Sequence, residues 1–313
     1  MQFNKEIHLA PLQGFTDAPF RNAHAQIIGG IDTYYTPFVR IERNEFRSRD
    51  LRDISQSNNS VPHLVPQMIA STPEELLRIG KLFIEEGYSE ADLNLGCPFP
   101  AIAKKHKGSG ILKYPEEVKA LLAAIETLPE LSFSLKMRLG WETPEEAMAL
   151  IPSINSTPLR HVAIHTRVGL QQYKGVASPE LFQPLYESLN MPLFYNGDLN
   201  SIEDVEAIVS RYPNIKGVML GRGLLADPTL AKQLKSGERY TLEQQLEYAH
   251  KIHQELFDYY SSTLQGDQQL LTKMQSLWEY WLPQANSKLR KKMMKCGSIN
   301  NYTNFAEQLF RKG

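Results

Sequence analysis

The chain has 313 residues, of which 42% are hydrophobic and 22% are charged, and its formal net charge is −1. This composition is typical of a globular protein, the length fits one large barrel with an appendage, and the small net charge argues against a protein that coats nucleic acid over its whole surface. The sequence predicts no transmembrane helix and no signal peptide, and its two cysteines form no disulfide framework, so we expect a cytoplasmic protein without membrane contact.

Short apolar, β-rich runs alternate with helical patterns along the first two thirds of the chain. Eight such runs, each followed by a helical pattern, predict a closed parallel (β/α)8 TIM barrel, with an open doubly wound sheet as the alternative. The predicted strands are Ile7–Leu12, Thr33–Val39, His63–Ile69, Ala91–Leu95, Phe133–Leu139, His161–Thr166, Leu193–Asn196 and Gly217–Leu220.

Several of the intervening helices carry a recognisable start signal. Proline in the first turn followed by two acidic residues occurs at Pro73, Pro115 and Pro144, and proline and acidic side chains both suit the first turn of a helix. Ser201 followed by Glu203 and Asp204 is a fourth start.

The pattern changes after the last predicted strand. From Leu242 to Leu309 the chain is polar and helical, which predicts a barrel over residues 1–235 and a small all-α domain over residues 241–313. The stretch from Ala231 to the end holds 12 Lys+Arg against 8 Asp+Glu. A basic region on an acidic body suits a polyanion site, although a solvated helical surface explains the charge equally well.

Polar or glycine residues follow most of the predicted strands. In a (β/α)8 barrel the carboxyl ends of the strands form the active-site face, so one such residue is ordinary packing but the set predicts a site for a large polar ligand. The residues concerned are Pro11, Leu12, Gln13, Gln67, Asn94, Cys97, Lys136, Arg138, His165, Arg167, Asn196, Gly197, Asp198, Gly221 and Arg222.

Two of these strand ends have the form of a phosphate site. Gly221-Arg222-Gly223 lets backbone N–H groups approach a phosphate and adds a guanidinium, and Asn196-Gly197-Asp198 follows the preceding strand.

Lys136 suits a different role, for which two interpretations remain open. It would stabilise negative charge on a reduced flavin, or act as a Schiff-base nucleophile. Gln67 has an amide suited to the polar edge of a flavin ring, with a buried amide that satisfies backbone groups as the alternative.

Cys97 lies at the end of a buried strand, between Gly96 and Pro98. A structural cysteine is the commonest fate of this residue type, and a metal ligand is disfavoured because no second ligand lies at suitable spacing. The strand break and the basic, glycine-containing segment that follows favour a general acid or a nucleophile covered by a mobile loop. Cys296 lacks comparable surroundings, and we expect it to be structural.

Taken together, these motifs resemble the tRNA-dihydrouridine synthases, flavin-dependent (β/α)8 enzymes with a C-terminal helical domain. Leu12, Thr166, Val168 and Ser109 depart from the wording common in that family, and none of them removes a proposed catalytic group. The matching segments are APLQGFTD (10–17), DLNLGCP (92–98), LKMRLGW (135–141), HTRVGLQQYKG (165–175), NGD (196–198) and GRG (221–223). Two further segments, PFVRIE (37–42) and MRLGWE (137–142), resemble the subfamily that acts near the tRNA elbow.

The resemblance implies a chemistry and a set of roles. NADPH, or NADH, would reduce FMN, hydride would pass to C6 of a tRNA uridine, and Cys97 would protonate C5. Asn94 would lie near the base, and Arg138 and Arg167 would contact the substrate. FMN would be held by Pro11, Leu12, Gln13, Gln67, Lys136, His165, Asn196, Gly197, Asp198, Gly221 and Arg222.

A uridine inside folded tRNA must be extruded to reach such a site, which requires a grip on the phosphates around it. Lys104, Lys105 and Lys107 on one rim and the lysines of the helical tail would supply that grip. We expect a monomer.

Three other functions remain as alternatives to a tRNA-dihydrouridine synthase. They are a small-molecule FMN oxidoreductase of the dihydroorotate dehydrogenase type, a flavin-free Schiff-base lyase at Lys136, and a non-catalytic RNA-binding protein.

Overall fold

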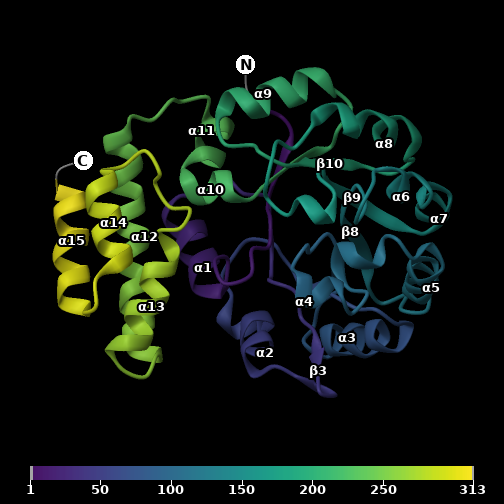
Figure 1. Ribbon diagram of the computed structural model, residues 1–313, viewed down its shortest axis with the longest axis horizontal. Coiled ribbons are helices and arrows are strands. Elements are labelled where there is room, and N and C mark those ends of the chain that lie inside the picture. Colours follow the sequence, from purple (N-terminus) through teal and green to yellow (C-terminus); the bar gives the residue numbers. More distant parts are fainter. Residues whose placement is uncertain (1–2, 312–313) are drawn as a thin grey trace.

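The computed structural model describes residues 3–311 and shows a barrel of parallel strands ringed by helices, with a helical bundle on one side (Figure 1). Parallel pairing runs in the order β5-β2-β1-β11-β10-β9-β8-β7-β6, which confirms the predicted TIM barrel over the open sheet. The strands are β1 (Glu6–Leu9), β2 (Thr33–Tyr35), β5 (Leu64–Val65), β6 (Gln67–Met68), β7 (Glu90–Leu95), β8 (Ser132–Arg138), β9 (Leu159–His165), β10 (Leu193–Asn196) and β11 (Gly217–Leu220).

A proline interrupts the strand at which the barrel closes. The third predicted strand, 63–69, is in fact two short strands, β5 and β6, because Pro66 between them has no N–H to donate to the ladder. β5 pairs with β2 and β6 pairs with β7, and the carbonyl of Pro66 still accepts the N–H of Asp92 at 3.0 Å. The two ends of the strand order are therefore consecutive in the chain, and the ring is closed.

Strand register brings the polar strand ends to one level. Asn94 of β7 is the partner of Lys136 of β8, and His165 of β9 is the partner of both Arg138 and Asn196. Because carboxyl ends of parallel strands meet on one face, these side chains are grouped at the mouth of the barrel.

The helices around the barrel begin largely where the sequence predicts. Thr72 accepts the N–H of Glu75 at 3.3 Å, and Ser201 and Asp204 form a capping box, whereas the start at Pro144 yields only one turn. These helices are α1 (Ala18–Ile27), α2 (Ser48–Ile54), α3 (Pro73–Glu85), α4 (Pro100–Ala103), α5 (Pro115–Ile125), α6 (Glu145–Met148), α7 (Ile151–Ser156), α8 (Gln183–Ser188), α9 (Ile202–Arg211), α10 (Arg222–Ala226) and α11 (Leu230–Ser236).

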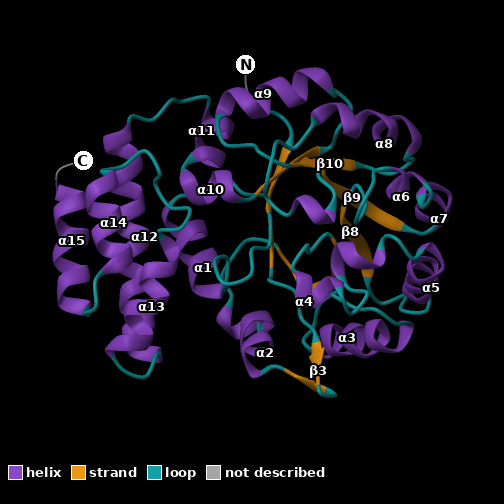
Figure 2. Ribbon diagram, in the orientation of Figure 1, coloured by secondary structure: helices purple, strands orange, loops and turns teal. Residues whose placement is uncertain are grey.

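A small antiparallel hairpin, β3 (Ile41–Glu42) and β4 (Glu45–Phe46), projects from the loop after β2 (Figure 2). The prediction extended the second strand to residue 39 and did not include this hairpin. Its turn uses Arg43 and Asn44, both at positive φ. Single 3₁₀ turns complete the barrel at Gln56–Asn58, Gly108–Ile111, Gly169–Gln171 and Pro179–Phe182.

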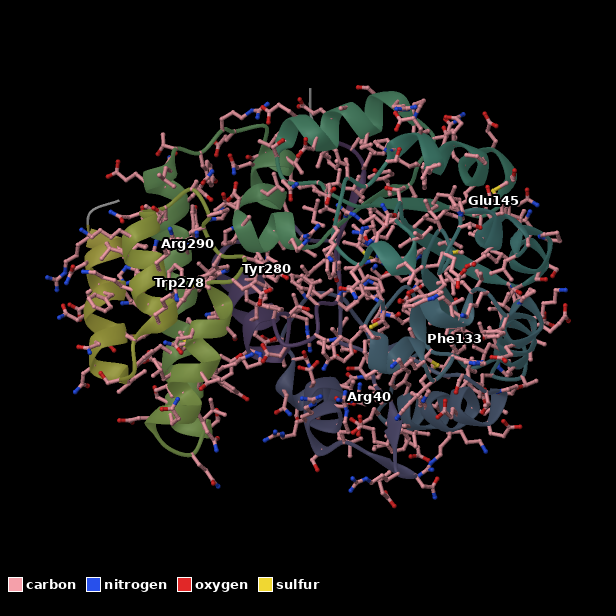
Figure 3. The ribbon with its side chains drawn as sticks, in the orientation of Figure 1. Arg40, Phe133, Glu145, Trp278, Tyr280 and Arg290 are labelled. Atoms are coloured by element: carbon pink, nitrogen blue, oxygen red, sulfur yellow. The ribbon has the colours of Figure 1, made fainter. Side chains whose placement is uncertain are left out.

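The C-terminal region is helical, as the sequence indicates. It comprises α12 (Leu242–Thr263), α13 (Asp267–Leu277), α14 (Ser287–Lys295) and α15 (Ile299–Arg311). Its core contains the buried side chains of Trp281 and of Trp278, the latter labelled in Figure 3. Tyr302 Oη accepts the indole N–H of Trp278 at 2.8 Å, which satisfies a polar group in that core. None of the helices in residues 3–311 has the length and apolarity needed to cross a membrane.

The helical region rests on the barrel through α12, which packs along α1. Tyr260 of α12 donates its hydroxyl to both carboxylate oxygens of Asp17, at 2.8 and 2.9 Å. Lys273 of α13 binds the same carboxylate at 2.8 Å and the carbonyl of Gly14 at 3.0 Å. The bundle thus holds the loop after β1, which carries Pro11, Leu12 and Gln13.

Candidate functional site

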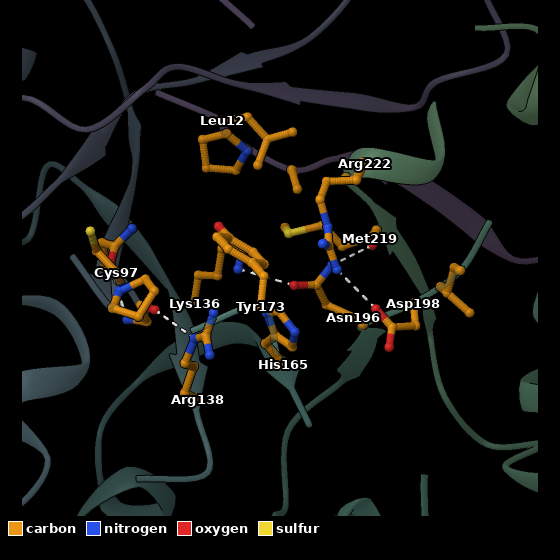
Figure 4. A pocket seen from close by; sticks show the side chains of 18 of the residues that line it. Leu12, Cys97, Lys136, Arg138, His165, Tyr173, Asn196, Asp198, Met219 and Arg222 are labelled. Atoms are coloured by element: carbon orange, nitrogen blue, oxygen red, sulfur yellow. Dashed lines mark hydrogen bonds and ion pairs between the residues drawn. The ribbon is translucent and has the colours of Figure 1, made fainter. Parts of the chain in front are cut away.

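A cavity that is open to solvent lies at the carboxyl ends of the strands (Figure 4). Most of the predicted site residues line it: Pro11, Leu12, Gln13, Asn94, Cys97, Lys136, Arg138, His165, Asn196, Gly197, Asp198, Gly221 and Arg222.

Lys136 provides a buried cation on the floor of this cavity. Its ammonium donates to Asn196 Oδ1 at 3.1 Å, and Asn196 in turn donates to the carbonyl of Met219 at 2.6 Å. Burial, aided by the charge of Arg138, lowers the pKa of Lys136 to about 8. The side chain therefore remains mostly charged at neutral pH, but it loses its proton far more readily than an exposed lysine does.

His165 lies next to this cation as a neutral ring. Burial is the main reason that the pKa of His165 lies well below its ordinary value, and the positive charges of Arg138 and Lys136 lower it further. Arg167 Nη1 lies 3.2 Å from Nε2 of His165, and a guanidinium can only donate. Nε2 therefore accepts, and the ring carries its proton on Nδ1.

Asp198 joins two arginines at the opposite side of the cavity. Arg167 donates to both of its oxygens, at 2.9 and 2.5 Å, and Arg222 donates to Oδ1 at 3.0 Å. Burial alone would raise the pKa of Asp198, but the hydrogen bonds and charge of Arg167 lower it. The carboxylate thus stays ionised and leaves the remaining N–H groups of Arg222 available at the cavity wall.

Cys97 is held by the side chain of Asn94. Oδ1 of Asn94 accepts the N–H of Cys97 at 2.8 Å and that of Gly96 at 3.0 Å. Burial raises the pKa of the Cys97 thiol, so that at neutral pH the sulfur keeps its proton. A protonated thiol at a cavity wall suits a proton donor better than a thiolate nucleophile.

Gln67 lies behind this cavity and does not form part of its wall. It is fully buried, accepts from Asn94 Nδ2 at 2.8 Å and donates to Asp92 at 2.7 Å. Ser134 donates to the other oxygen of Asp92 at 2.6 Å. The structure therefore gives Gln67 a place in a chain of hydrogen bonds that orients Asn94, and its role as a contact to a cofactor stays a prediction.

The two arginines expected to contact substrate are committed to backbone and carboxylate partners. Arg138 lines the cavity but donates to the carbonyls of Gly96, Val168 and Gln172 at 2.7–3.0 Å. Arg167 is almost fully buried, and it does not line the cavity. Both hold the loops after β7, β9 and β10 together.

The basic segment after Cys97 differs from the expected mobile loop. Gly108 and Ser109 are buried against Cys97, whose carbonyl accepts both the N–H and the hydroxyl of Ser109 at 3.0 Å. Lys107 is buried and pairs with Glu75 at 2.7 Å, so it does not face the solvent where RNA would lie. Lys104 is exposed, as expected. The segment supports Cys97 from behind.

A second, largely apolar cavity adjoins the first, and we call it the vestibule. It lies between the barrel mouth and the helical region, next to Tyr280 (Figure 3). The ring centroids of Tyr280 and Phe15 are 5.0 Å apart. Of its aromatic residues the sequence indicates only Tyr173, as a stacking surface or a packing residue; Phe15, Phe38, Phe99 and Tyr280 each look like ordinary core candidates, whereas the arginine-rich stretch 40–52 is a usable signal. The vestibule is lined by Leu12, Gln13, Phe15, Phe38, Arg40, Arg49, Cys97, Pro98, Phe99, Ile102, Gln172, Tyr173, Arg222 and Tyr280.

Two solved structures illustrate a similarity in fold. Morphinone reductase superposes with a TM-score of 0.52 at 12% identity, covering 77% of this chain and 87% of the other. The old yellow enzyme from Trypanosoma cruzi gives a TM-score of 0.50 at 11% identity, covering 78% and 91%. At such low identity these matches support the barrel fold alone.

Sequence relatives are more informative. A "tRNA-dihydrouridine(16) synthase" of Neisseria meningitidis serogroup B is 32% identical over 241 residues, 74% of this chain and 72% of the relative. A "tRNA-dihydrouridine synthase B" of Pasteurella multocida is 27% identical over 242 residues, covering 75% and 70%. The family model described as "Dihydrouridine synthase (Dus)" matches residues 8–312. The chain therefore belongs to the dihydrouridine synthase family, the oxidoreductases that form dihydrouridine in tRNA.

Proposed function

We propose that this enzyme uses FMN and NADPH, or NADH, to reduce the C5–C6 bond of one tRNA uridine, with Cys97 as the proton donor. The observation that carries this proposal is that the thiol of Cys97 and the ammonium of Lys136 line one cavity, with Asn94 fixing the backbone of the cysteine. The family match supports this chemistry over a small-molecule FMN oxidoreductase and over a Schiff-base lyase.

The residues of the cavity fit a flavin. An ammonium carries three donors, and in the described part of the chain a single acceptor, Asn196 Oδ1, binds that of Lys136. The remaining donors suit the N1–C2 edge of a flavin ring, where a cation stabilises the negative charge of the reduced form. Arg222 and the glycines Gly197 and Gly221 suit the phosphate, and Pro11, Leu12 and Gln13 would cover the ring.

Bound FMN would supply the hydride for C6 of the uracil. The protein would then have three tasks: Cys97 would donate its proton to C5, Lys136 would keep a positive charge next to the cofactor, and the mouth would exclude water. Because burial raises the pKa of the Cys97 thiol, the proton is present at neutral pH before the base arrives. Arg138, Arg167, Gln67 and Asn94 act as positioning residues in this scheme.

The substrate must reach this site as a single extruded nucleotide, because a stacked base inside folded tRNA cannot approach the floor of a barrel. Exposed cations at Lys104, Lys105 and along α14 would bind the phosphates around it. We assign residues 1–235 to catalysis and residues 241–313 to tRNA binding. We propose that the enzyme acts as a monomer, and the tRNA substrate supports a cytoplasmic location.

The relative from Neisseria meningitidis suggests position 16, near the tRNA elbow, as the target. Mapping dihydrouridine in tRNA from a strain that lacks this protein tests that assignment. Loss of dihydrouridine at another position would overturn the position while leaving the reaction intact.

The purified protein tests the reaction itself. It should show a flavin absorption spectrum, oxidise NADPH and form dihydrouridine in unmodified tRNA transcripts. Cys97→Ala should keep the flavin and the reduction of flavin by NADPH but lose dihydrouridine formation. A colourless protein that takes up no FMN would refute the cofactor, and a fully active Cys97→Ala would refute the proton donor.

A further inference from the structure

The vestibule has an outer part that the FMN site does not share. Leu12, Gln13 and Cys97 belong to the wall between the two cavities, whereas Phe99, Ile102, Arg40 and Arg49 line the vestibule alone. We propose that this outer part is a binding site for the nucleotide next to the target uridine, with its base stacked on Phe99 and its phosphate beside Arg49. The inference rests on the proposed function.

Phe99 supplies the stacking surface. It directly follows Pro98 in an extended conformation, and 61% of the residue is exposed at the rim of the vestibule. A phenylalanine exposed to that degree does little for the stability of the barrel, and aromatic faces are the usual platform for unpaired bases. Its position two residues after Cys97 ties the stacked base to the reaction site.

Arg49 supplies the charge. Its side chain is 60% exposed, and the nearest carboxylate, that of Asp50, is 3.8 Å away. Asp50 is already held by Arg47 through two hydrogen bonds of 2.7 and 2.8 Å, so Arg49 keeps most of its donors for a ligand. None of the described residues that line the vestibule is acidic.

The order of the cavities indicates which nucleotide binds there. The target uracil must lie against the wall that contains Cys97, because the thiol has to reach C5. The RNA chain leaves that wall through the vestibule, and its next base meets Phe99 before it reaches the bulk solvent. A stacked neighbour would also hold the extruded uridine out of the tRNA, which offsets part of the cost of unstacking it.

The first test is a steady-state comparison of Phe99 variants with unmodified tRNA transcripts. Phe99→Ala should raise the KM for tRNA roughly 10-fold or more, the loss expected for one stacked base, and Phe99→Tyr should restore it. The KM for NADPH should stay unchanged in both variants. Leu181→Ala, which removes an apolar side chain 41% exposed outside both cavities, is the matched control and should behave as wild type.

A second test uses the substrate. Once the target uridine has been mapped, transcripts carrying an abasic site on either side of it are assayed. At one of the two positions, the abasic site should raise the KM of the wild-type enzyme for tRNA. The same abasic site should not raise the KM of Phe99→Ala any further, because that variant already lacks the aromatic ring on which the base stacks. If each abasic site raised the KM by the same factor in the wild type and in Phe99→Ala, the stacking proposal would be overturned.

Salt dependence tests Arg49. In Arg49→Gln the slope of log KM for tRNA against log salt should fall by about 1, the change expected for one lost phosphate contact. Arg52→Gln removes an exposed arginine from the same helix that does not line the vestibule, and its slope should match wild type.

The outcomes separate this inference from the proposed function. A wild-type enzyme that forms no dihydrouridine would refute the function itself. An active wild type with Phe99→Ala at the wild-type KM for tRNA would refute only the stacking site. A rise in the KM for NADPH in place of that for tRNA would instead assign the vestibule to the dinucleotide, and would equally overturn the proposal.

Discussion

The amide of Asn94 fixes the proposed acid, because its Oδ1 accepts the backbone N–H of Cys97 at 2.8 Å. Asn94→Ala would leave this N–H and that of Gly96 without their acceptor, and each buried unsatisfied donor costs about 1–3 kcal/mol. We expect the loop to shift and dihydrouridine formation to fall at least ~10-fold, with flavin binding retained, because an error of about 1 Å in position costs that much or more. Single-turnover reduction of tRNA measures this.

Asn155 offers a matched control for Asn94. Its side chain also makes two backbone contacts, to the carbonyl of Ser188 at 2.8 Å and to the N–H of Asn190 at 2.9 Å, but on the outside of the barrel. Asn155→Ala should lower the free energy of unfolding and leave turnover unchanged. Equal turnover losses in the two variants would show that stability, and not the position of Cys97, determines the rate.

Gly108 supports Cys97 from the other side. It has φ of +61°, and a Cβ at this position would lie 2.5 Å from the carbonyl oxygen of Cys97. We expect Gly108→Ala to displace the cysteine and to reduce dihydrouridine formation far more than NADPH oxidation. Gly237→Ala is the control, because Gly237 has a similar φ of +76° with no atom within 4 Å of its would-be Cβ. Both variants carry backbone strain of about 1–3 kcal/mol, so only steric contact separates them.

The charge on Lys136 predicts a pH dependence. Its pKa is lowered to about 8, so the ammonium is lost as the pH rises through that value. If this charge stabilises the reduced flavin, the rate at which NADPH bleaches the flavin absorbance should fall above about pH 8. Lys136→Arg keeps a positive charge to much higher pH, and its rate should show no such fall, even if its absolute value is lower. An identical descending limb in the variant would assign the titration to another group.

The fold was predictable because its signals are local. Proline and acidic residues mark the helix starts, and the polar strand ends identify the catalytic face without any knowledge of packing. A polar residue at a strand end looks the same in sequence whether it points into the cavity, as Arg138 does, or lies behind it, as Gln67 and Arg167 do. Only the structure shows that their partners are the Gly96 carbonyl, Asp92 and Asp198.

The partner of Lys107 and the aromatic contact beside the vestibule could not be predicted from the sequence either. Lys107 lies in a basic run that suits a solvated loop, and its partner Glu75 lies 32 residues away in α3. Tyr280 reaches Phe15 from the far end of the chain. Such pairings depend on tertiary structure, and neither composition nor periodicity encodes them.

Buried histidines predict acid sensitivity. His24 is fully buried, with its ring nitrogens 2.9 Å from the Tyr34 hydroxyl and from the carbonyl of Pro228, and burial lowers its pKa from 6.5 to about 4. The unfolded chain therefore takes up a proton before the native protein does, so stability is lost as the pH falls below 6.5. At pH 5 this amounts to about 2 kcal/mol. Urea unfolding of His24→Gln at pH 7 and pH 5 should show a smaller loss than wild type, and equal losses would contradict it.

The contact between the helical region and the barrel depends on Asp17. Lys273 and Tyr260, from two different helices, both bind its carboxylate, and Lys273 also binds the carbonyl of Gly14. Because Lys273 is only 19% exposed, this pair is screened less than a surface ion pair, and leaving Asp17 partly unpaired should cost about 1–3 kcal/mol.

We therefore expect Lys273→Met to loosen the loop after β1 and to widen the vestibule. The KM for tRNA should rise several-fold, while the rate of flavin reduction by NADPH changes little, since the lysine lies outside both cavities. Lys251→Met is the control: it removes an ion pair with Glu247 whose lysine is 52% exposed, and such pairs contribute about 0–1 kcal/mol. If both variants bind tRNA as the wild type does, the Asp17 contact serves stability alone and the helical region does not need it to present the substrate.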